Sequence, residues 1–321
     1  MPFFDAMKHA ELLGEIEKKL DQIQWLIPGK TENTLVRKLY DLKNQLLTSQ
    51  DLEPDELINT LKNSDRLIEN LTHAQKAAAF AANKLTSTNY PTFNPVSNTT
   101  LETLRSEINE SNLLELFNSL KTKRTQLAES MHQPSVAAFD QTTYRKGVGV
   151  NIGLWYRYAL DKKQPKFGNC TEQADTAFVY LYTTACENYI DKQSIPFDRL
   201  ERMDVENAIG GHVYLLMDRA KSEKFIPQNK YPIEEFLTEI NKLGHTCVVI
   251  DPWNKAHPFY PASDICLHMP ACGLTGNINI EFGLDFSEQA PNQIRDATAP
   301  RDATAPKEDV ISNNCSRIMP R

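Results

Sequence analysis

Apolar residues recur at spacings of three and four from residue 5 to about residue 130. This is the period of one face of an α-helix, and it predicts that the N-terminal part of the chain is almost entirely helical. Two such faces are formed by Leu13, Ile16, Leu20, Ile23 and Ile27, and by Leu35, Leu39, Leu42 and Leu46. Pro28-Gly29 divides them, since proline and glycine interrupt helices. Such helices joined by short loops predict an antiparallel bundle over residues 1–135.

Two further helices complete the predicted bundle. One begins at Pro54 and continues into the alanine-rich stretch over residues 77–82. The other begins at Thr99 or Thr100, where Glu102 completes a capping box, and it follows a loop predicted over residues 86–98. The bundle is either a structural support or a module that binds a partner protein, and the sequence leaves both interpretations open.

The sequence changes character near residue 140 and predicts a mixed α and β domain over residues 136–287. Two runs with strand character, 213–217 and 246–250, flank a segment in which apolar residues return at helical spacing. Beyond this domain the chain is polar, and the hexamer at residues 295–300 is repeated without change at residues 301–306. Such a segment cannot bury a core, so residues 288–321 are predicted to be disordered. The predicted fold class is α+β.

The composition argues against several classes of protein. The formal net charge is −7 and the basic residues are scattered, so nucleic acid is not an expected partner. No stretch approaches the roughly 18 apolar residues that span a bilayer, and the first residues lack the apolar core of a secretory signal peptide. The six cysteines are too sparse and irregular for a disulfide framework. We therefore expect reduced thiols and a cytoplasmic location.

Cys170 is the strongest candidate for a chemical role. It lies in Gly168-Asn169-Cys170-Thr171-Glu172, just before a run with helical character. A cysteine at a helix N-terminus meets the positive end of the helix dipole and free backbone N–H groups, which favour the thiolate. Gly168 is expected to let the backbone pass close to a substrate carbonyl. The alternative is a buried structural cysteine, which is the commoner fate of this residue type.

His212 and Asp251 are the candidate partners of this cysteine. His212 opens the first strand-like run after Gly210-Gly211, and Asp251 ends the second. If the two strands pair antiparallel, the Cβ atoms of His212 and Asp251 lie ~5 Å apart, which suits a base and its orienting acid in a thiol triad. The long connection between the strands is more usual for parallel strands, which would bring His212 near His245 instead. The periodicity leaves both arrangements open.

The order of these blocks resembles the papain-like and transglutaminase-like cysteine peptidase superfamily. The resemblance is closest to bacterial effector proteins with Gly-Asn-Cys-x-Glu, Gly-x-His and Asp-Pro-Trp blocks, and it covers about residues 140–285. It implies an antiparallel sheet with Cys170 as the nucleophile, His212 as its base and Asp251 as the orienting acid. It also places Gln164, six residues before the cysteine, as an oxyanion-hole candidate. The long spacing between His212 and Asp251 departs from transglutaminase cores and requires an inserted helix.

The resemblance implies a cysteine protease or a related acyl-transfer enzyme that acts on amide bonds of a protein or peptide substrate. A protein deamidase or transglutaminase would use the same triad, and a helical adaptor with a degenerate thiol domain is the non-catalytic alternative. Likeness to effectors also implies export without a classical signal peptide into the cytosol of a host, whose proteins would then be the substrates.

No cofactor is expected, and a metal site is the alternative that the sequence raises. The spacing Cys266-x-His268-x3-Cys272 is loosely similar to a zinc site. His245, Cys247 and His257 lie in the same part of the chain. Structural zinc sites usually present two tight pairs of ligands, such as Cys-x2-Cys, and none occurs here. We therefore do not expect zinc.

Overall fold

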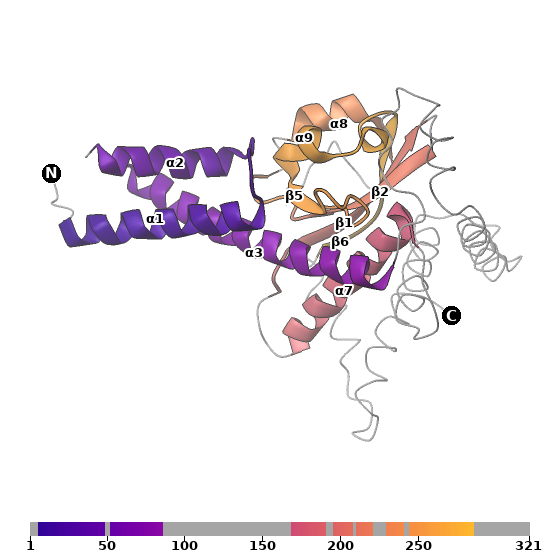
Figure 1. The fold of residues 1–321 in the computed structure, drawn as a ribbon, viewed down its shortest axis with the longest axis horizontal. Coiled ribbons are helices and arrows are strands. Elements are labelled where there is room, and N and C mark those ends of the chain that lie inside the picture. Colours follow the sequence, from indigo (N-terminus) through magenta and orange to yellow (C-terminus); the bar gives the residue numbers. More distant parts are fainter. Residues whose placement is uncertain are drawn as a thin grey trace, which may run out of the picture.

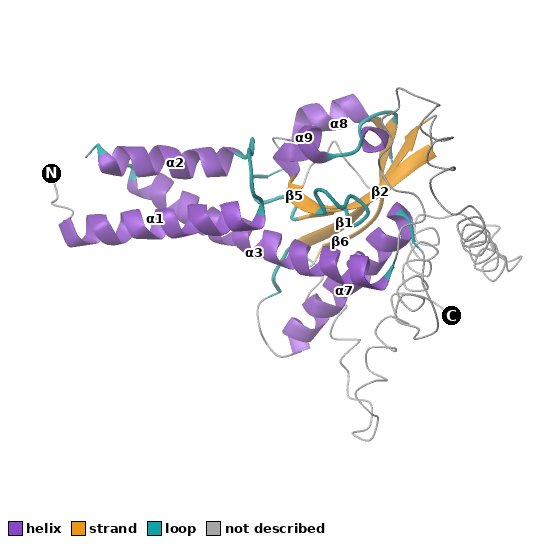
Figure 2. Ribbon diagram, viewed as in Figure 1, coloured by secondary structure: helices purple, strands orange, loops and turns teal. Residues whose placement is uncertain are grey.

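The computed structural model describes residues 6–48, 52–85, 168–190, 195–207, 210–220, 229–240 and 244–285. Its first helices are α1 (Ala6–Leu26), α2 (Thr34–Leu47) and α3 (Pro54–Lys84). The elements that follow are α7 (Cys170–Ile190), β1 (Arg199–Asn207), β2 (Gly210–Met217), β3 (Lys230–Pro232), α8 (Ile233–Ile240), β4 (Val248–Ile250), β5 (Phe259–Pro261), η1 (Ala262–Asp264), α9 (Ile265–His268), η2 (Ala271–Gly273) and β6 (Asn277–Asp285). The protein is therefore mixed α and β, as the sequence predicts (Figure 2).

Local sequence signals set the ends of the first three helices. Helix α1 stops before Pro28-Gly29, where Gly29 adopts a positive φ of 113°. The Asn33 side chain caps α2 by accepting hydrogen bonds from the N–H groups of Leu35 and Val36. Helix α3 begins with Pro54, whose missing N–H costs nothing at the first helical position. These three predicted helices are confirmed.

All neighbouring strands pair antiparallel in a six-stranded sheet with the order β3-β6-β1-β2-β4-β5. Strand β2 pairs with β4 in a register that places Leu215 opposite Ile250. Of the two arrangements that the periodicity left open, the antiparallel one, which the family resemblance implied, is therefore the one found, despite the long connection. Part of that connection forms β3, which pairs with β6 at the opposite edge from β5, and part forms α8. The connection is long because the chain runs from β2 to the opposite edge of the sheet, where β3 lies, and then returns to β4.

Helices cover both faces of the sheet (Figure 1). Along β2 the residues alternate, with Val213, Leu215 and Met217 in the core shared with α3 and α7, and with Tyr214 and Leu216 in the core shared with α8. Helices α1 and α2 extend away from the sheet with the first half of α3, whereas the second half of α3 lies beside α7. The sheet is therefore the middle layer of a three-layer arrangement.

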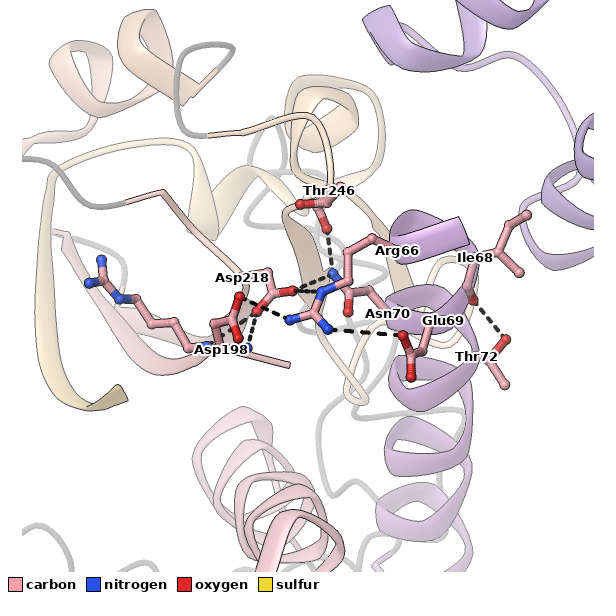
Figure 3. A network of polar contacts seen from close by, with 9 residues as sticks. Arg66, Ile68, Glu69, Asn70, Thr72, Asp198, Asp218 and Thr246 are labelled. Atoms are coloured by element: carbon pink, nitrogen blue, oxygen red, sulfur yellow. Dashed lines mark hydrogen bonds and ion pairs between the residues drawn. The ribbon is translucent and has the colours of Figure 1, made fainter. Parts of the chain in front are cut away.

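Helix α3 belongs to both the helical bundle and the sheet domain. One continuous hydrophobic core includes Leu39 of α2, Leu71 and Ala78 of α3, Phe178 of α7 and Leu215 of β2. Arg66 and Asn70 of α3 also reach the end of β2, where both donate to the Asp218 carboxylate (Figure 3). The predicted boundary near residue 135 lies outside the described residues, but the described parts on either side of it share a core.

Two long strands, β1 and β6, were not predicted from the sequence. Several other predictions fall on residues that the structure does not describe: the loop over 86–98, the fourth helix, Gln164 and the polar tail over 288–321. Within the described residues, no helix is long and apolar enough to cross a membrane.

Candidate active site

Cys170 is the first residue of α7, as the sequence predicts, and it is partly exposed. The turn before it is held by reciprocal hydrogen bonds. The Asn169 N–H donates to the Glu172 carboxylate at 2.8 Å, which is the backward contact of a capping box. The Gln173 side chain donates to the Gly168 carbonyl at 2.8 Å, and the Gln173 N–H donates to the Asn169 carbonyl at 3.0 Å. The nucleophile candidate therefore sits on a rigid helix start.

Gly168 has a packing role that differs from the predicted one. A Cβ atom at this position would lie 2.8 Å from Cβ of Glu172 and 2.9 Å from Cδ1 of Leu85, the residue that follows α3. Both distances are shorter than normal contacts between carbon atoms. Glycine is required here because the start of α7 lies directly against the end of α3. The predicted role beside a substrate carbonyl stays a prediction.

His212 and Asp251 form a buried ion pair. Nε2 of His212 lies 2.7 Å from Oδ2 of Asp251, and both side chains are completely buried. His212 lies near the start of β2, and Asp251 directly follows β4, so antiparallel pairing of the two strands brings the residues together. The pairing thus creates the base-to-acid contact that the sequence left open.

The charges around His212 favour its protonated form. Burial alone would lower the pKa of the imidazole, but the Asp251 carboxylate and, next, the Cys170 sulfur together raise the pKa well above its ordinary value. Cys170 thus lies close enough to His212 to interact with it electrostatically. The site joins a thiol, an imidazole and a carboxylate from three different elements.

The second nitrogen of His212 is available on the side away from Asp251. Within the described part of the chain, Nδ1 of His212 is buried and makes no regular hydrogen bond. Since Nε2 is occupied by Asp251, Nδ1 is the atom through which the imidazole can exchange a proton with the Cys170 thiol. A base whose other nitrogen is fixed by a carboxylate holds one tautomer and one orientation.

Aromatic and turn residues shield the His212–Asp251 pair from water. The Trp253 ring lies 5.1 Å from the His212 ring, centroid to centroid, and the Tyr214 ring lies 6.0 Å from it. On another side, the η2 turn is so close that a Cβ atom on Gly273 would lie 3.0 Å from Cδ2 of His212. Exclusion of water strengthens the attraction between imidazolium and carboxylate.

Two residues near the site were not predicted to belong there. The pKa of the Cys272 thiol is raised by burial, and it is also influenced by the charges of His212, Cys170 and Asp251. Arg202 of β1 likewise interacts with the charge of Cys170. The sequence suggested Cys272 only as a possible zinc ligand. Arg202 was not singled out because its strand, β1, was not predicted.

His245 does not take part in the His212–Asp251 pair. Its ring is exposed and hydrogen-bonds with Thr34 of α2, and its carbonyl accepts from the Asn33 side chain at 3.1 Å. Among the described residues, no group of three or more His, Cys, Asp or Glu side chains is arranged to hold a metal ion. His257 and His268 stack on each other instead, with ring centroids 4.0 Å apart.

Comparison with known proteins adds no family to this picture, because no family model, no curated protein and no solved structure matches the chain. The geometry of Cys170, His212 and Asp251 is therefore the basis on which a function can be assigned.

Proposed function

We propose that this protein is a thiol enzyme that cleaves or transfers acyl groups at amide bonds of proteins or peptides, with Cys170, His212 and Asp251 as its triad. The observation that carries the proposal is the state of His212, whose Nε2 binds Asp251 while its Nδ1 is left for the thiol at the start of α7. A cysteine protease is the function that this arrangement supports best.

The first half of the reaction follows from these positions. His212 accepts the proton of the Cys170 thiol, and the thiolate attacks the amide carbonyl carbon. The carbonyl oxygen becomes negatively charged and accepts a hydrogen bond from the backbone N–H of Cys170 at the start of α7. Gln164 is the additional donor that the family resemblance suggests. Asp251 stabilises the imidazolium without taking its proton.

The second half restores the enzyme. The imidazolium gives its proton to the leaving amine, the C–N bond breaks, and a thioester on Cys170 remains. Water attacks the thioester in a protease or deamidase, whereas an amine attacks it in a transglutaminase. Water loses a proton to His212, the C–S bond breaks, and the thiol returns. A protease releases a peptide amine, whereas a deamidase and a transglutaminase both release ammonia from glutamine. Incorporation of an amine into the product distinguishes the transglutaminase from the deamidase.

The first test measures the reactivity of Cys170. The intact protein is treated with substoichiometric iodoacetamide at pH 7, and the modified site is located by peptide mass spectrometry. We expect Cys170 to alkylate at least roughly ten times faster than the exposed Cys266, because a thiolate is the reactive species. The variant Cys266→Ala serves as the matched control and should leave the rate at Cys170 unchanged.

The second test measures turnover. Fluorescent casein, a glutamine-containing protein assayed for ammonia, and a fluorescent amine assayed for incorporation cover the three reactions. Cys170→Ala should lose all of the activity found, with an unchanged circular dichroism spectrum. If Cys170 reacts no faster than Cys266, or if Cys170→Ala keeps its activity, the triad proposal is wrong and the helical adaptor is favoured.

A further inference from the structure

A buried arginine links the sheet to the helix that carries Cys170. Nε of Arg202, on β1, donates to Oδ1 of Asp175 at 2.6 Å, and a second guanidinium nitrogen of Arg202 pairs with Glu281 of β6. Asp175 belongs to α7 and lies five residues after Cys170. Arg202 and Asp175 are both buried. The guanidinium therefore connects two strands to the first turns of α7.

The ladder between β1 and β6 is irregular where this link is made. The register passes from Arg202–Phe282 to Met203–Ile280, so the extra residue is Glu281 of β6, the residue that pairs with Arg202. Arg202 and Met203 face opposite sides of the sheet, as successive strand residues do, and Met203 packs in the core shared with α8 while Arg202 reaches α7. A bulge changes the direction of side chains in a strand, and bulges are common beside functional sites.

Arg202 lies close enough to Cys170 for the charges of the two side chains to interact. Burial would lower the pKa of Arg202, but Asp175 raises it, and so does the negative charge that Cys170 can carry. Burial raises the pKa of Asp175 to about 6 although Arg202 opposes the shift. Glu281 is the second carboxylate that pairs with Arg202.

A buried ion pair is a poor way to stabilise a fold, because desolvation offsets most of the attraction. The same sheet holds a second buried pair, in which Arg219 donates to both oxygens of Glu201 at 2.6 and 2.7 Å. That pair joins β1 to the residues after β2. Of these two pairs, the Arg202 pair is the one whose carboxylate lies on the helix of Cys170.

We propose that Arg202 is a positioning residue for Cys170. It fixes the start of α7 against β1, the neighbour of the strand that carries His212. This inference rests on the proposed thiol chemistry. It assigns to one residue the distance between the nucleophile and its base.

The experiment measures the rate of Cys170 alkylation by iodoacetamide from pH 5 to pH 9 in the full chain. For Arg202→Met we expect a rate at pH 7 lower by roughly 10- to 100-fold, since a displacement of about 1 Å at a catalytic group has effects of this size. Arg202→Lys keeps the charge without the two-pronged geometry and should recover part of the rate.

Arg219→Met is the matched control, because it also leaves a buried carboxylate without its arginine. It should lower the unfolding midpoint as much as Arg202→Met does, without changing the alkylation curve. If Arg202→Met does not fold, Arg202→Met combined with Asp175→Asn and Glu281→Gln removes the buried charges together, and this variant should fold and still alkylate slowly.

The outcomes separate this inference from the proposed function. A reactive Cys170 whose alkylation curve is unchanged in folded Arg202→Met, or in the neutral triple variant, overturns the role of Arg202 alone. Equal slowing in Arg202→Met and Arg219→Met also overturns it, because that result assigns the effect to stability. A wild-type Cys170 no more reactive than Cys266 overturns the thiol chemistry and, with it, the inference.

Discussion

Nε of Arg66, in the middle of α3, lies 2.7 Å from Oδ2 of Asp218, the residue that follows the strand carrying His212. Asp218 has a positive φ of 57°, which is unfavourable for a residue with a Cβ atom. Its other carboxylate oxygen accepts from the N–H groups of Asp198 and Arg199, at 2.6 and 3.2 Å. A network of hydrogen bonds thus connects helix α3 to the end of β2 (Figure 3).

Asn70 is the buried member of this network, and its replacement tests the network directly. Its side-chain nitrogen donates to Asp218 at 2.9 Å and to the Thr246 carbonyl at 2.8 Å. Asn70→Ala removes one donor of Asp218, which keeps Arg66, and the side-chain donor of the Thr246 carbonyl, so we expect a loss of about 1–3 kcal/mol in the free energy of unfolding, measured with urea. The control Glu69→Ala removes a solvent-exposed partner of Arg66 and should cost less than about 0.5 kcal/mol. Equal effects of the two variants would contradict this account.

A chain that lacks residues 1–85 tests whether the sheet domain is independent of the bundle. Removal of α3 exposes the apolar face of α7 and of the central strands, which share one core with it. We expect the shortened chain to aggregate or to bind a hydrophobic dye such as ANS, as proteins with exposed cores do. A monomeric product with a native near-ultraviolet circular dichroism spectrum would show instead that the predicted separate domains are correct.

Gly168→Ala tests the close packing between α3 and α7. The added methyl group overlaps with Leu85 and Glu172, so the start of α7 must shift. We expect a loss of about 1–3 kcal/mol in unfolding free energy together with slower alkylation of Cys170. Leu85→Ala in the same chain should restore part of the alkylation rate, because it removes one of the two overlaps. A Gly168→Ala protein with unchanged stability and alkylation rate would refute the overlap.

The two candidate bases can be separated by kinetics. His212→Ala should reduce turnover nearly as much as Cys170→Ala, because members of a triad act as a unit. Asp251→Asn should reduce it by roughly 10²- to 10⁴-fold, since the imidazole loses its orienting acceptor. His245→Ala should change only stability, because its ring binds Thr34. The measurement is the steady-state rate of each variant on the substrate found in the turnover assays. A large loss of rate in His245→Ala would show that His245, and not His212, is the base.

The His212–Asp251 pair predicts a defined pH dependence of stability. The pKa of His212 is raised in the folded protein, so the pair stabilises it fully below the unfolded pKa of about 6.5 and loses its effect as pH rises through the raised value. The difference in unfolding free energy between the wild type and Asp251→Asn should therefore be largest near pH 6. Above that pH it should decline by at most about 1.4 kcal/mol per pH unit. A difference that grows from pH 6 to pH 9 would contradict the raised pKa.

Local signals in the sequence were enough for the parts of the fold that depend on neighbouring residues. Pro28-Gly29 and Pro54 mark helix ends, and the helix that starts at Cys170 was predicted from the residues around it. Both strands of the His212–Asp251 pair were also predicted, because their apolar residues are contiguous. Such features depend on backbone propensity and on side chains a few residues apart.

The remaining features of the fold depend on contacts between residues that are far apart in the sequence. Strand β1 was not predicted because charged residues such as Glu201 and Arg202 are typical of a protein surface. In the structure both are buried, and each is paired with an opposite charge: Glu201 with Arg219, and Arg202 with Asp175. The direction of the β2–β4 pairing, and with it the contact of His212 with Asp251, was equally open, since a strand sequence does not specify its neighbour. By itself the sequence determined where α1 ends, where α3 and α7 begin, and where the runs that form β2 and β4 lie. Only the tertiary structure supplied the counter-charges and the neighbouring strands, because these come from residues far apart in the chain.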